Sequence, residues 1–117
     1  MKIIRRIFAY LRIREAMKLA DKAFAENNHR YFVIPSSGIS SKLIVLDRAT
    51  FRHLKKDGYI ESTLSVRDLL HDSFYYTPND NGKDALPPYG VKAKRLSYYN
   101  YVEAVHMAKK ARKANKK

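Results

Sequence analysis

Cysteine is absent from the 117 residues. The chain can therefore form neither a disulfide framework nor a thiolate zinc site, and nothing in it demands an oxidising compartment. Long apolar runs are also missing, because Arg5, Arg6, Arg12 and Arg14 interrupt the apolar start of the chain. This pattern excludes a signal-peptide core and a transmembrane span. We expect a cytoplasmic protein.

Motifs that carry catalysis or bind metal are missing as well. The four histidines (His29, His53, His71 and His106) are scattered, and none has the spacing of a metal-ligand motif. There is no nucleophile elbow and no glycine-rich nucleotide loop. The serine-rich segment 36–41 lacks the lysine and the following helix of a phosphate-binding loop, so we interpret it as a turn. We expect no metal, no cofactor and no enzyme activity.

Positive charge is abundant and unevenly distributed, with a net charge of +13. Residues 1–18 contain six basic residues and one acidic residue, a net charge of +5, and residues 92–117 contain nine and one, a net charge of +8. Residues 19–91 contain nine of each sign. The two ends therefore hold the whole net charge, which favours contact with a polyanion. The alternative is that these are solvated helices whose lysines keep the protein soluble.

The segment from Met1 to about Asn27 has no proline or glycine and predicts a long helix. At 100° per residue it carries two apolar stripes on nearly opposite sides. The first contains Ile3, Ile4, Ile7, Phe8 and Leu11, and the second contains Ile13, Met17, Ala20, Ala23 and Phe24. One straight helix cannot turn both stripes toward one core. Either the helix is kinked or sandwiched in a larger assembly, or the C-terminal helix covers the first stripe, or residues 1–12 protrude as an amphipathic docking segment.

The middle of the chain predicts a small sheet and two short helices. Two β-branched apolar runs, 30–35 and 42–47, flank the serine-rich turn and predict an antiparallel hairpin. Asp47 is a candidate N-cap for a helix over 49–56 that ends at Gly58, and residues 59–60 are a candidate edge strand. Ser65 and Asp68 have the spacing of a capping box at the start of a helix over 66–73. We interpret the cations of the first of these helices, including Arg48 and Arg52, as a solvated face.

A loop over 77–90 precedes the last helix, which we expect to begin between Val91 and Arg95. One face of this helix should dock on the rest of the protein, through Tyr98, Tyr101, Val102, Val105 and Ala108. The predicted fold is α+β, with a long N-terminal helix, a hairpin, two short helices, a loop and a basic C-terminal helix. We assign one small domain to 1–107 and a basic tail that continues the last helix to 108–117.

The opposite face of the last helix combines cations with aromatic rings, at Tyr99, Glu103, His106, Lys110 and Lys113. Lysine and arginine neutralise phosphates, and tyrosine and histidine rings stack on unpaired bases. We therefore predict a non-catalytic module that binds nucleic acid, RNA in preference to DNA. The candidate contact residues are Arg5, Arg6, Arg12, Lys94, Arg95, Tyr99, His106, Lys109, Lys110, Arg112 and Lys113.

The alternative prediction is a subunit of a larger protein assembly. Its docking surface would be the first stripe, Ile3, Ile4, Ile7, Phe8 and Leu11, which could also join two copies of the chain or touch an anionic membrane surface.

Overall fold

The computed structural model describes residues 2–36, 40–58, 63–78 and 85–114. Its elements follow one another as α1 (Ile3–Asn27), β1 (Tyr31–Pro35), β2 (Leu43–Asp47), α2 (Arg48–Lys56), α3 (Val66–Asp72), β3 (Tyr75–Tyr76) and α4 (Pro88–Ala114). The α+β class, the long first helix and the hairpin are confirmed.

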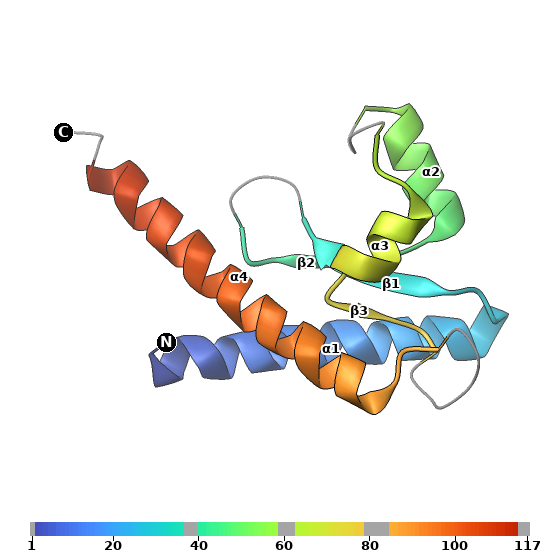
Figure 1. Ribbon diagram of the computed structural model, residues 1–117, viewed down its shortest axis with the longest axis horizontal. Coiled ribbons are helices and arrows are strands. Elements are labelled where there is room, and N and C mark those ends of the chain that lie inside the picture. The colour runs from blue at the N-terminus through green and yellow to red at the C-terminus, as the bar shows by residue number, and fades with distance from the viewer. Residues whose placement is uncertain (1, 37–39, 59–62, 79–84, 115–117) are drawn as a thin grey trace.

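The three strands form one antiparallel sheet in the order β2-β1-β3. Val33 of β1 pairs with Val45 on one side and with Tyr75 on the other. Because side chains alternate along a strand, Val33 and Tyr75 point toward α1 and α4, and Phe32 points toward α2 and α3. Figure 1 shows α1 along one side of the strands and α2 and α3 on the other. Helices therefore cover both faces of this small sheet.

Two apolar clusters hold the layers together. The larger joins α1, α4 and one face of the sheet, and its buried members include Ala9, Ile13, Ala20, Tyr98 and Val102. The alanines let the backbones approach closely. The smaller cluster joins the other face to the short helices and contains Phe32, Leu46, Phe51 and Leu69.

The first stripe of α1 is not part of either cluster. Its five side chains are between 44% (Leu11) and 76% (Ile3) exposed, whereas Ile13 is 1% exposed. The C-terminal helix packs on the opposite side of α1, where Ala9 is fully buried. The prediction that this helix covers the stripe is therefore wrong. No helix among the described residues combines the length and the apolar content needed to cross a bilayer.

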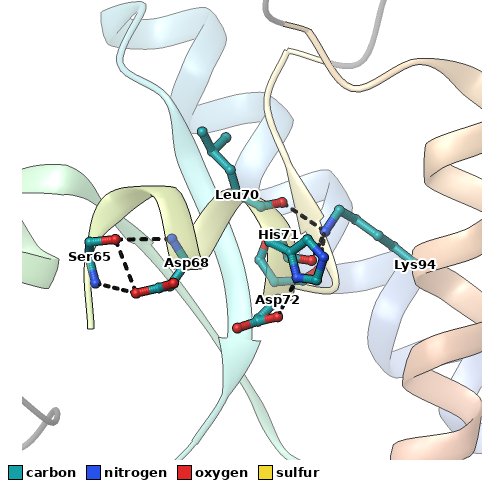
Figure 2. A network of polar contacts seen from close by, with 7 residues as sticks. Ser65, Asp68, Leu70, His71, Asp72 and Lys94 are labelled. Atoms are coloured by element: carbon teal, nitrogen blue, oxygen red, sulfur yellow. Dashed lines mark hydrogen bonds and ion pairs between the residues drawn. The ribbon is translucent and has the colours of Figure 1, made fainter. Parts of the chain in front are cut away.

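Local capping signals placed both short helices correctly. The Asp47 carboxylate accepts a hydrogen bond from the backbone N–H of Thr50 at 2.8 Å, and Gly58 follows α2 with a φ of 85°. Ser65 and Asp68 form the reciprocal bonds of a capping box, seen in Figure 2. The candidate edge strand at 59–60 and residues 37–39 of the serine-rich turn lie outside the described residues.

Two boundaries differ from the predictions. Tyr75–Tyr76 forms a third strand, held by Phe74 N–H to the Val33 carbonyl (2.8 Å) and Thr77 N–H to the Tyr31 carbonyl (3.0 Å). The last helix begins at Pro88, earlier than expected, because proline fits the first turn of a helix, where its missing N–H would have no partner.

Candidate nucleic-acid interface

The two basic ends of the chain lie at the same end of the molecule. Arg5 Nε donates to Glu103 Oε2 at 3.1 Å, which ties the first turn of α1 to the middle of α4. In Figure 1 both termini lie on the left, on the side away from α2. The basic segments from the two ends of the chain therefore lie toward one end of the molecule, and the last turns of α4 extend away from α1.

The exposed part of α4 carries most of this charge. Val105 is its last buried residue, and the helix continues to Ala114. Lys109 and Arg112 follow Val105 on one side, and Lys110 and Lys113 follow His106 on another. These four cations and His106 are exposed, and none has an ion-pair partner among the described residues. Positive charge therefore surrounds the end of α4.

A hollow of about 380 Å³ lies where α1 meets α4. The Arg6 guanidinium carbon lies 5.5 Å from the centre of the Tyr99 ring, and that of Arg95 lies 6.0 Å from the Tyr10 ring. The Arg95 Nε atom is buried and has no hydrogen-bond partner in the described part of the chain. Ile3 and Ile7 complete the wall, so this hollow brings together residues of both predicted surfaces. Flat rings and guanidinium planes are groups on which an unstacked base can stack.

Arg12 is directed inward. Its Nε donates to the Tyr98 hydroxyl at 2.8 Å, and that hydroxyl donates to the Ser41 carbonyl at 2.7 Å. Burial raises the pKa of Tyr98, and the nearby Arg12 cation acts in the opposite direction. Arg12 and Arg5 thus fix the helices in place, and their charges are already engaged.

The Lys94 ammonium group uses three hydrogen bonds within the protein. Its Nζ donates to the carbonyl oxygens of Leu70, His71 and Ser73 at 3.0, 3.1 and 2.6 Å, which satisfies the C-terminal end of α3 (Figure 2). Burial lowers the pKa of Lys94, while the Asp72 carboxylate acts against this shift. The sequence places Lys94 among basic residues of one helix, but its acceptors lie 21 to 24 residues earlier. We leave Lys94 out of the proposed interface.

The histidines do not assemble a reaction centre. His53 lies 3.2 Å from Asp57, His71 lies 2.7 Å from Asp72 and both pairs face solvent. Within the described ranges, no three histidine, aspartate or glutamate side chains gather as metal ligands.

No protein-family model, curated protein or solved structure matches this chain. The candidate interface is therefore defined by its own side chains.

Sequence reasoning missed a second basic region, at the other end of the molecule. His29, Arg30, Arg48 and Arg52 line one hollow between α1, α2 and α3. The signal that could have found it is the hairpin register, because pairing of Tyr31 with Asp47 brings the residues on either side of them together.

Proposed function

We propose that this protein is a non-catalytic cytoplasmic module that binds nucleic acid, RNA in preference to DNA, through the basic end formed by α1 and α4. The observation that carries this proposal is the group of exposed cations on the last turns of α4, which have no ion-pair partner among the described residues, while Glu103 of the same helix is already paired with Arg5. A surface of this kind attracts phosphates whatever their sequence.

The interface would make two kinds of contact, one with backbone phosphates and one with a base. Lys109, Lys110, Arg112 and Lys113 would neutralise backbone phosphates, since they are exposed and have no ion-pair partner among the described residues. The hollow lined by Arg6, Arg95 and Tyr99 would hold an unstacked base. Single-stranded RNA offers both groups, whereas duplex DNA hides its bases.

Fluorescence anisotropy across a salt series tests this proposal, with labelled single-stranded RNA, duplex RNA and duplex DNA. We expect log Kd to rise linearly with log salt. Replacing Lys109, Lys110, Arg112 and Lys113 by glutamine should reduce the slope by up to about 3 for a single strand. The matched control replaces Lys22, Lys42, Lys56 and Arg67, four exposed cations that line neither the candidate interface nor the hollow beside α2. No binding at low salt, or equal losses in both variants, contradicts the proposal.

One observation favours a second candidate function, assembly into a larger particle. The five side chains of the first stripe are exposed on the outer side of α1, and Leu19 extends the apolar surface with 59% exposure. A contiguous exposed apolar patch of this kind favours contact with another protein.

Gradient sedimentation of the tagged protein from its own cells tests the second candidate. Ile7→Glu with Phe8→Glu should move the protein from fast-sedimenting fractions to the top of the gradient, and Tyr89→Glu, at a side chain 79% exposed elsewhere, should not. If the unaltered protein already stays at the top, the assembly role is excluded. Binding of the stripe to anionic lipid vesicles would instead indicate a membrane surface.

A further inference from the structure

A hollow of about 690 Å³ opens between the turn that follows α1, the start of α2 and α3. Its polar wall carries His29, Arg30, Asp47, Arg48 and Arg52. Val66 and Leu70 of α3 supply an apolar wall. In Figure 1 these elements lie on the right, at the end away from both termini. The hollow is therefore separate from the candidate nucleic-acid interface.

The strand register explains why these residues meet. Tyr31 pairs with Asp47, so Arg30 before β1 lies beside Arg48 after β2. Arg52 follows Arg48 by one helical turn and adds a second guanidinium on the same side of α2. The Arg30 guanidinium carbon lies 5.3 Å from the centre of the Tyr76 ring, a contact that orients this side chain before any ligand arrives.

Arg48 and Arg52 destabilise α2. Arg48 stands in the first turn, where the helix dipole disfavours positive charge, and that turn contains no acidic residue. Arg48 and Arg52 are like charges four residues apart, which repel each other. Neither has an ion-pair partner among the described residues.

Among the described residues that line the hollow, Asp47 is the only carboxylate. It accepts the Thr50 N–H at 2.8 Å and lies 3.9 Å from His29 Nδ1. This engaged carboxylate forms no ion pair with Arg48 or Arg52. Natural proteins keep such unfavourable local features, here a cation in the first turn of a helix and a pair of like charges, mainly at functional sites.

We propose that this hollow binds a phosphate ester of about the size of a nucleotide. Guanidinium groups bind phosphate through paired N–H donors, and Arg48 and Arg52 offer two of them side by side. Val66 and Leu70 would pack against the sugar or base. The volume falls in the range of roughly 300–1,000 Å³ that is typical of small-molecule sites. The phosphate could belong to a free nucleotide or to a nucleic-acid strand, and the two sources share this chemistry.

Amide chemical-shift titration of the full chain tests the proposal, with inorganic phosphate, ATP and a short single-stranded RNA as separate probes. We expect saturable shifts at residues 29–30, 48–52 and 66–70. Arg48→Gln with Arg52→Gln should weaken binding about tenfold or more. Arg67→Gln, which removes an exposed arginine of α3 that does not line the hollow, is the matched control and should leave binding unchanged.

Saturation by ATP would identify a free nucleotide as the ligand, and saturation by RNA without ATP would identify a strand. The proposal is overturned if no probe saturates these amides, if shifts appear only at residues 106–114, or if the double variant binds as tightly as the unaltered chain. A urea unfolding curve checks that the double variant is folded, and shift mapping on the unaltered chain remains decisive if it is not. Neutralising the α4 cations should leave phosphate binding in the hollow intact. Failure of the proposed hollow is therefore distinguishable from failure of the proposed nucleic-acid interface.

Discussion

Tyr98 accepts a hydrogen bond from Arg12 over 2.8 Å, although 86 residues separate them in the chain. The same hydroxyl donates to the Ser41 carbonyl, so one buried group on α4 holds both α1 and the segment that leads into β2. Removing it leaves a donor and an acceptor without a partner.

Tyr98→Phe should therefore lower the free energy of unfolding by about 1–2 kcal/mol, since part of the loss is recovered when water reaches the half-exposed Arg12. Urea unfolding followed by circular dichroism measures the change. Tyr89→Phe, on an exposed side chain of the same helix, should change stability by less than about 0.5 kcal/mol. Equal urea midpoints of unfolding for the two variants would show that the hydrogen bonds of Tyr98 contribute nothing to stability.

Lys94→Met should lower the free energy of unfolding by about 2 kcal/mol, because three carbonyl oxygens at the end of α3 lose their donor. RNA affinity of the folded variant should stay unchanged. Lys92→Met removes an exposed cation close by and should leave stability unchanged. A loss of RNA affinity without a loss of stability would return Lys94 to the interface.

Ile7→Glu and Ile13→Glu should behave in opposite ways, because the first side chain is 52% exposed and the second is 1% exposed. We expect Ile7→Glu to change stability by less than about 0.5 kcal/mol. Ile13→Glu buries an unpaired carboxylate and should cost more than about 3 kcal/mol. Thermal unfolding compares the two, and a large loss for Ile7→Glu would mean that the stripe is covered.

Acid should weaken the start of α2. Hydrogen bonds from Thr50 hold the pKa of Asp47 below its ordinary value of 3.8, with a smaller contribution from His29. Since the folded pKa is the lower one, this stabilisation is complete above pH 3.8 and is lost as the pH falls through the folded value. Asp47→Asn keeps the capping oxygen but cannot titrate. Urea unfolding at neutral pH and at about pH 3 measures the fall in the free energy of unfolding. This fall should be smaller for Asp47→Asn than for the control Glu26→Gln, which keeps the Asp47 carboxylate.

Local signals in the sequence were sufficient for most of the elements. A long segment without proline or glycine gave α1, two β-branched runs gave the hairpin, and Asp47, Ser65 and Asp68 located the short helices. Each of these signals acts between neighbouring residues. The two-residue strand β3 has no such signal, because Tyr75 and Tyr76 are held by pairing with β1 and by contacts with residues far away in the chain.

The candidate site was predicted less completely, for the same reason. Exposure of His106 and of the four cations after it follows from their position beyond Val105, the last buried residue of α4. Engagement of Arg5, Arg12 and Lys94 depends on partners far away in the chain. The sign and number of charges can be read from the sequence, but which charges remain available depends on tertiary contacts.

The contact between α1 and α4 also sets the order of events during synthesis. The face of α1 that carries Ala9 and Ile13 leaves the ribosome before Tyr98 and Val102, which cover it. At a synthesis rate of roughly 5–20 residues per second, that face stays exposed to solvent for several seconds on each nascent chain. A chain arrested before Tyr98 should be cleaved readily by protease and bound by chaperones, whereas one extended past Val105 should resist cleavage. The packing of α1 against α4 therefore forms only after α4 has been synthesised.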